Sequence, residues 1–169
     1  MRISKAKHRL KRRVSVVLRL FALLLALLAF WASRFPMTNL AQTSPNSADA
    51  QLRTRFYQMP VEDVAREVQN AVPRLKTYGR RWQVVQTTRQ SDKITIRCEV
   101  PVLVFTDDLS ISLQETSGRT QLDVRSQSRV GKGDFGENKR HLLQLLRHLD
   151  AVLPTDYAPP STPPTTPPK

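Results

Sequence analysis

The sequence predicts an α+β domain in two layers, helix–four-stranded antiparallel meander–helix, preceded by an N-terminal transmembrane helix. Three observations carry this prediction. Residues 14–32 are almost uninterrupted apolar sequence. Two later segments repeat apolar residues at helical spacing, and four runs between them alternate apolar with polar residues and are joined by short turns. Two helices with one apolar face each can cover one face of such a meander.

The N-terminal segment has the composition of a signal anchor. Residues 1–13 form a basic leader, and Val14–Ala32 holds nineteen residues with one charge, Arg19. About 20 apolar residues cross a bilayer core as a helix, so we expect a single pass with lipid as the partner. The positive-inside rule keeps the leader in the cytoplasm and places the domain outside it, in a periplasm or thylakoid lumen. The alternative is a cleaved signal peptide and a secreted domain; the missing small-x-small site favours the anchor.

The net charge of +13 reflects mainly this leader. Residues 1–19 contain eight Lys or Arg and no acid, whereas residues 50–153 contain 17 basic and 12 acidic residues. A basic patch that binds nucleic acid is not normally followed by an apolar run of membrane length, so no nucleic-acid partner is expected. The one cysteine, Cys98, excludes an internal disulfide and lies in an apolar alternation, which predicts a buried core residue.

Two segments flank the predicted domain at residues 53–153. Residues 33–52 are predicted as a linker, because Thr38–Ala50 is polar, rich in small residues and without period. The tail from Pro154 to Lys169 contains seven prolines and is predicted to be extended and disordered.

The first half of the domain contains one helix and two strands. Pro60 opens the helix, Pro73 and Gly79 close it, and its apolar face consists of Val61, Val64, Ala65, Val68, Val72 and Leu75. Trp82–Thr88 is the first strand, and a turn at Ser91-Asp92 leads into the second, Lys93–Phe105. Pro101 implies an edge position or a bulge there.

The second half continues the meander and ends in a helix. Thr106-Asp107-Asp108 is predicted as a hairpin loop, Leu109–Leu113 as a strand, Thr116-Ser117-Gly118 as a turn, and the run through Leu122 and Val124 as the fourth strand. Asp134 is the predicted N-cap of the last helix, with Glu137 completing a capping box. Its apolar stripe is Leu142, Leu145, Leu146, Leu149 and Leu153.

The densest polar segment lies between the fourth strand and this helix. Gly131, Gly133 and Gly136 spell G-x-G-x-x-G, but a dinucleotide site needs a further parallel strand and none remains, so no cofactor is expected. A glycine-rich turn at a helix start presents free N–H groups, which with basic neighbours could hold an anion. The candidate anion-binding residues are Arg125, Ser126, Ser128, Arg129, Gly131, Lys132, Gly133, Asp134 and Asn138, supported by Asp107, Asp108 and Arg140. In the alternative interpretation, Arg125 and Arg129 pair with Asp107, Asp108 or Asp134, and the glycines only make the turn.

An enzymatic alternative uses the same region. A hydrolase could employ Asp107 or Asp108 with Ser126 or Ser128, but no His or Cys stands near in sequence to activate a serine. The two aspartates are adjacent and would point to opposite faces of a strand. His141 and His148 are seven residues apart, too far for the usual paired ligands, so no metal site is expected. The sequence therefore favours a noncatalytic binding module and assigns no catalytic residue.

Three segments resemble the signature of the domain-of-unknown-function family DUF1499, in its bacterial or cyanobacterial form with an N-terminal anchor. They are Phe105-Thr106-Asp107-Asp108, the run Asp123-Val124-Arg125-Ser126-Gln127-Ser128-Arg129-Val130-Gly131, and Asp134-Phe135-Gly136-Glu137-Asn138-Lys139-Arg140. The resemblance covers about Arg53 to Leu153. Ser47 stands where the family often has a cysteine, and Lys139-Arg140 is shifted against the usual arginine spacing. The family implies a domain that often follows signal or anchor segments, without an established reaction.

Overall fold

The computed structural model describes residues 16–30 and 38–155 of the chain. The chain divides into two compact units, Met1–Pro36 and Met37–Lys169. In the first unit, residues 16–30 form a helix whose large apolar side chains are about half exposed or more. The outer residues of the predicted span, 14, 15, 31 and 32, and the basic leader lie outside the described residues. Within the described ranges, no helix has the combined length and apolar character needed to cross a membrane.

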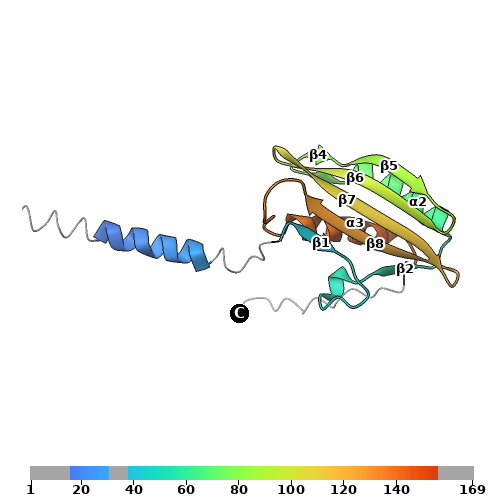
Figure 1. Ribbon diagram of the computed structural model, residues 1–169, viewed down its shortest axis with the longest axis horizontal. Coiled ribbons are helices and arrows are strands. Elements are labelled where there is room, and N and C mark those ends of the chain that lie inside the picture. The colour runs from blue at the N-terminus through green and yellow to red at the C-terminus, as the bar shows by residue number, and fades with distance from the viewer. Residues whose placement is uncertain (1–15, 31–37, 156–169) are drawn as a thin grey trace, which may run out of the picture. The chain divides into compact units, whose positions relative to one another are not determined.

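The second unit is built on one antiparallel sheet (Figure 1). Its strands are β1 (Leu40–Gln42), β2 (Arg55–Tyr57), β5 (Gln83–Arg89), β6 (Lys93–Val102), β7 (Phe105–Thr116) and β8 (Arg119–Ser128). The order is β1-β8-β7-β6-β5. β2 also pairs with β8, at residues 120–122, whereas β1 pairs with residues 125–127. The predicted meander is therefore confirmed as β5 to β8. A separate two-stranded ribbon consists of β3 (Lys76–Thr77) and β4 (Arg80–Arg81).

Two helices cover one face of the sheet, as the apolar stripes predict (Figure 1). They are α2 (Val61–Ala71), which continues into the 3-10 turn η2 (Val72–Arg74), and α3 (Glu137–Val152). A second 3-10 turn, η1 (Ala50–Leu52), precedes β2. The predicted leucine stripe of α3 and the Val/Ala stripe of α2 pack against the inward residues of β6, β7 and β8 in one core. Cys98 is part of that core, as expected.

The segment predicted as a flexible linker is instead part of the sheet. β1 pairs with β8 from Leu40↔Gln127 to Gln42↔Arg125. Thr43 extends the contact: its hydroxyl accepts from the backbone N–H of Val124 at 2.8 Å and donates to Asp123 at 2.9 Å. The strand is only three residues long and too short to show alternation. It forms because β8 would otherwise expose a row of unpaired backbone groups.

The hairpin between the second and third strands lies earlier than predicted. Thr106, Asp107 and Asp108 belong to β7, and the turn is formed by the apolar residues Leu103 and Val104, of which Leu103 has φ +49°. The sequence reasoning assigned the turn to the polar residues. Pro101 lies in β6, beyond Glu99, the last residue of this strand that β5 pairs with, so its missing N–H breaks no ladder bond on that side.

The start of the proline-rich tail is also packed. The carbonyl of Pro154 accepts from the N–H of Gln58 at 3.2 Å, and Thr155 forms a β-bridge with Tyr57. Residues 156–169, the rest of the predicted tail, lie outside the described residues.

Candidate functional site

The alternation of β8 divides the candidate residues between the two faces of the sheet. Ser126 and Ser128 point toward the helices, whereas Arg125 and Arg129 are exposed on the uncovered face. Asp107 and Asp108 on the neighbouring strand are divided in the same way, as predicted for adjacent strand residues. The residues predicted as one anion site therefore form two separate groups.

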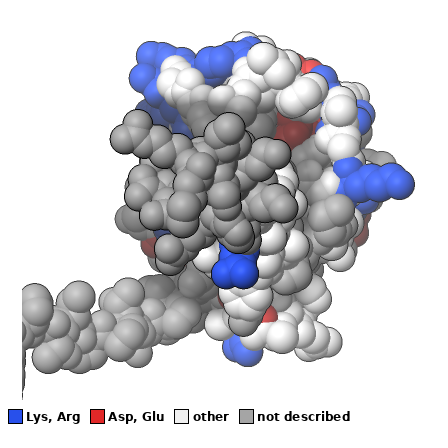
Figure 2. All heavy atoms as spheres, turned by 90° about the vertical axis from the view of Figure 1, so that its left-hand side faces the viewer, with Lys and Arg blue, Asp and Glu red and all other residues white. Residues whose placement is uncertain are grey.

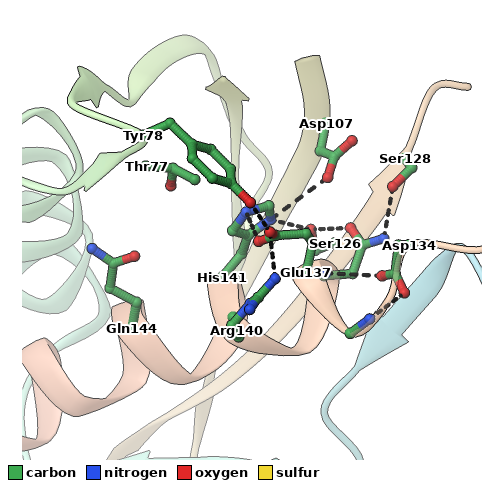
Figure 3. A network of polar contacts seen from close by, with 12 residues as sticks. Thr77, Tyr78, Asp107, Ser126, Ser128, Asp134, Glu137, Arg140, His141 and Gln144 are labelled. Atoms are coloured by element: carbon green, nitrogen blue, oxygen red, sulfur yellow. Dashed lines mark hydrogen bonds and ion pairs between the residues drawn. The ribbon is translucent and has the colours of Figure 1, made fainter. Parts of the chain in front are cut away.

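The first group is a polar network under the sheet, in which Asn138 of α3 bonds to Ser126 and Ser128 of β8. Figure 3 shows the two serines beside Asp107 and His141. The side-chain oxygen of Asn138 accepts from the hydroxyl of Ser126 at 2.6 Å. Its amide nitrogen donates to the hydroxyl of Ser128 at 2.9 Å and to the carbonyl of Asn39 at 3.0 Å. Asn138 thus ties α3 to β8 and to the residue just before β1.

Asp107 and His141 lie beside this network. Nδ1 of His141 is 3.7 Å from Oδ2 of Asp107 and 3.5 Å from the hydroxyl of Ser126. Burial lowers the pKa of His141 to about 4 and raises the pKa of Asp107 above its usual value. Trp82 packs edge-on against the imidazole at 5.7 Å between ring centres. Both ionisable groups are therefore held in a dry environment that favours their neutral forms.

The charged groups nearest the imidazole from its own helix are Glu137 and Arg140 (Figure 3). Oε2 of Glu137 is 3.7 Å from Nε2 of His141, and Glu137 also pairs with Arg140 and accepts from the hydroxyl of Tyr78. Arg140, predicted as a supporting residue of the anion site, is mostly exposed and pairs inside the domain.

The structure corrects one argument against the hydrolase, because His141 does lie next to Ser126. The geometry still does not match a catalytic triad. Ser126 and Asp107 both approach the same nitrogen of His141, whereas a triad places them on opposite nitrogens. Ser126 is also fully buried and donates its proton to Asn138. We therefore interpret this group as a structural network.

Two of the N–H groups at the start of α3, which were predicted to be free, are bonded to a side chain of the same segment. The carboxylate of Asp134 accepts from the N–H groups of Gly136 and Asn138, both at 2.9 Å. The N-cap position itself is occupied by Gly136, with φ +82°, and not by Asp134. The N–H groups of Gly136 and Asn138 at the start of α3 are therefore already bonded within the domain.

The second group lies on the uncovered face, where cross-strand register builds two rows. Arg97 on β6 is opposite Ser110 on β7, which is opposite Arg125 on β8. The next row contains Glu99, Asp108 and Gln127 in the same order. Residues of both rows line a hollow of about 610 Å³ together with Arg129 and with Val85 and Gln86 at the β-bulge of β5.

Arg129 forms ion pairs with both acidic residues of the second row, Glu99 and Asp108. Its Nη2 lies 2.6 Å from both Asp108 and Glu99, and its Nε donates to Asp108 at 3.1 Å. The hydrogen bond from Arg129 lowers the pKa of Asp108. This pairing confirms one part of the alternative interpretation of the sequence, in which arginines pair with the aspartates. Arg125 instead donates to the side chain of Gln127 at 2.9 Å.

Sequence reasoning missed Arg97, Ser110, Glu99 and Gln127 as members of this surface. The alternation of β6 and β7 did predict that Arg97, Glu99 and Ser110 face away from the core. The missing information was the register, which aligns Arg97 with Arg125 although they are 28 positions apart in the chain. Within the described residues, no cluster of His, Cys, Asp or Glu could hold a metal ion.

Residues 32–149 match the model of one protein family, whose description is "Protein of unknown function (DUF1499)". A comparison with curated proteins gives no match.

Proposed function

The chain belongs to the DUF1499 family of proteins of unknown function, and we propose that it is a membrane-tethered, noncatalytic module that binds an anionic group between Arg97 and Arg125. The observation that carries the proposal is the row Arg97–Ser110–Arg125 in the hollow of the uncovered face. The partner is a small anion or a protein that presents a carboxylate or phosphate.

The spacing of the row suits an anionic group. Neighbouring strands are about 4.8 Å apart, so the two arginine backbones are separated by about 10 Å with a hydroxyl between them. Two long guanidinium side chains can converge over such a gap, and each can offer paired N–H donors to a carboxylate or phosphate. Ser110 adds a third donor from below.

The charge of the hollow supports the same partner class. Among the described residues, neither Arg97 nor Arg125 forms an ion pair, while Glu99 and Asp108 are both engaged by Arg129. With three arginines and two carboxylates lining it, the hollow keeps a net positive charge. Arg97 and Arg125 supply the excess positive charge, although Arg97 also lies close enough to Asp108 to help lower the pKa of that carboxyl group.

The membrane tether is proposed from the sequence. Val14–Ala32 has the length and the single charge of a membrane-spanning helix, and its described part, residues 16–30, is helical with exposed apolar side chains. The basic leader places the domain outside the cytoplasm. Reporter fusions at Lys169 test this topology, and the mass of the mature chain distinguishes an anchor from a cleaved signal peptide.

The binding test uses the full chain in a zwitterionic detergent, titrated with inorganic phosphate and with succinate. The NMR signals of the amides around Ser110 should shift and saturate. We expect Arg97→Ala with Arg125→Ala to weaken binding at least tenfold, because both guanidinium groups are removed. Arg147→Ala, an exposed arginine on α3, is the matched control and should change little. The proposed site is wrong if the double variant binds both probes as the unmodified chain does.

A further inference from the structure

One end of the domain carries most of its exposed apolar side chains. Within residues 38–155, eight large apolar residues are exposed, and six of them lie in three loops or in the strand residues that flank them: Tyr78, Leu103, Val104, Phe105, Val130 and Phe135. Val104 is 85% exposed and Leu103 is 62% exposed. Scattered exposed apolar residues are ordinary, but a cluster at one end marks an interaction surface.

Hydrogen bonds hold the three loops side by side. Arg80, in the ribbon β3–β4, donates to the carbonyl of Leu103 in the β6–β7 turn at 3.1 Å. Tyr78 in the same ribbon donates to Glu137 at the start of α3. The last paired residue of β8, Ser128, is opposite Asp107 near the start of β7, so the loop that follows β8 begins beside the β6–β7 turn. The β6–β7 turn and the 129–136 loop lie at the same end of the sheet (Figure 1).

Basic residues accompany the apolar ones. The three loops with their flanking strand residues, 76–81, 103–106 and 129–136, contain five Lys or Arg and one acid, Asp134. The carboxylate of Asp134 is already bound by backbone N–H groups. Arg80, Arg81 and Lys132 are exposed, and Figure 2, which faces this end, shows Lys and Arg side chains around its margin. Apolar tips within a basic margin match the interface of an anionic bilayer.

The chain enters the domain at this same end. The carbonyl of Thr38 accepts from the N–H of Asp134 at 3.2 Å, and the side chain of Asn39 donates to the carbonyl of Gly131 at 3.1 Å. In the sequence, five residues separate Thr38 from Ala32, the last residue of the apolar run. Such a connection spans at most roughly 20 Å. If the apolar run lies in a membrane, this end of the domain stays close to the lipid surface.

We propose that this end of the domain docks on an anionic lipid surface, with Leu103 and Val104 entering the interface and Arg80, Arg81 and Lys132 contacting phosphates. The inference rests partly on the membrane tether of the proposed function. It also places the anion site away from the lipid. Arg97 precedes Leu103 by six residues of a strand, about 20 Å, so the row Arg97–Ser110–Arg125 faces the aqueous phase above the headgroups.

The test reconstitutes the full chain into vesicles of phosphatidylcholine alone or with phosphatidylglycerol. A polarity-sensitive fluorophore is attached at Val104→Cys or, as the matched control, at Ser91→Cys in the hairpin at the other end of β6. Cys98 does not compete for the label, because burial raises the pKa of its thiol to about 12. We expect the probe at residue 104 to gain several-fold intensity in vesicles that contain phosphatidylglycerol, and the probe at residue 91 to report water. Arg81→Glu with Lys132→Glu should reduce the gain to that in phosphatidylcholine.

Flotation of the same samples separates the two proposals. If the chain floats with the vesicles but the probe at residue 104 reports water, the docking is overturned and the tether is retained. If the chain floats only with vesicles that contain phosphatidylglycerol, and the probe reports lipid, the docking is supported and the tether is overturned. A chain that floats with neither vesicle overturns both.

Discussion

Oδ2 of Asp107 and Nδ1 of His141 lie 3.7 Å apart beneath the sheet, and both residues are almost completely buried. Among the described residues, neither Oδ2 of Asp107 nor Nε2 of His141 has a hydrogen-bond partner. Burial raises the pKa of Asp107 and lowers that of His141 to about 4. Both shifts favour the neutral form, but they have opposite consequences for the stability of the domain in acid.

His141 should make the domain sensitive to acid. Between pH 6.5 and about 4, the unfolded chain binds a proton on this histidine that the folded chain does not bind. The free energy of unfolding therefore falls as the pH falls through this window, by up to roughly 3 kcal/mol. Urea unfolding at several pH values should show a shallower loss for His141→Gln. Equal slopes for the variant and the unmodified chain would contradict the assignment.

Asp107→Asn should change the same slope in the other direction. Above the ordinary aspartate pKa, the folded chain retains a proton that the unfolded chain releases, so Asp107 opposes the effect of His141. Its removal should make the loss of stability in acid steeper. The two variants are thus controls for one another in the same unfolding experiment.

The sequence was sufficient to predict the parts of the fold that repeat over many residues. The stripes of α2 and α3 and the alternation of β6 and β8 follow from burial of one face, and the structure confirms them. It was insufficient for β1 and β2, which are three residues each and are formed by pairing with β8. Long-range pairing of short strands leaves no periodic signal in the sequence.

The candidate site shows the same division. Sequence proximity grouped Arg125 with Ser126 in one site, although the two residues point to opposite faces of the sheet. For Asp107 and Asp108, the alternation of a strand was enough to predict opposite faces. On one face, pairing through β7 aligns residues of β8 with residues of β6, and on the other face β8 bonds to α3. His141 could have been recognised as inward-facing because it lies four residues before Leu145 on the stripe of α3.

Asn138→Ala should destabilise the domain by about 3 kcal/mol, because it leaves several buried polar groups without partners. Asn138 is fully buried and bonds to Ser126, Ser128 and the carbonyl of Asn39. Urea denaturation measures the change. The control is Lys139→Ala, at the position next to Asn138. It removes only an exposed ion pair with Asp49 and should cost less than about 1 kcal/mol. A similar small loss for Asn138→Ala would show that water replaces its contacts.

Arg55→Ala should be at least as costly, roughly 3 kcal/mol or more, because it removes one partner of a buried ion pair. Nε of Arg55 lies 3.0 Å from Asp150, and Tyr57 donates to the same carboxylate at 2.8 Å. This group joins β2 to the end of α3. Thermal unfolding should show a clear drop in Tm, while Arg66→Ala, in an exposed pair with Asp63, should leave Tm nearly unchanged. Equal effects would show that burial of Arg55 adds nothing.

Release of Arg129 should strengthen anion binding on the uncovered face. Asp108→Asn with Glu99→Gln removes the two carboxylates that hold Arg129 at 2.6 Å, and leaves a third free guanidinium in the hollow. We expect inorganic phosphate to bind several-fold more tightly at low ionic strength, with the gain reduced at high salt because the hollow is open to solvent. Glu62→Gln, an exposed acid on α2 outside the hollow, is the control. The gain should disappear when Arg97→Ala and Arg125→Ala are added. If it persists, phosphate binds at Arg129 alone, and the row Arg97–Ser110–Arg125 is not the site.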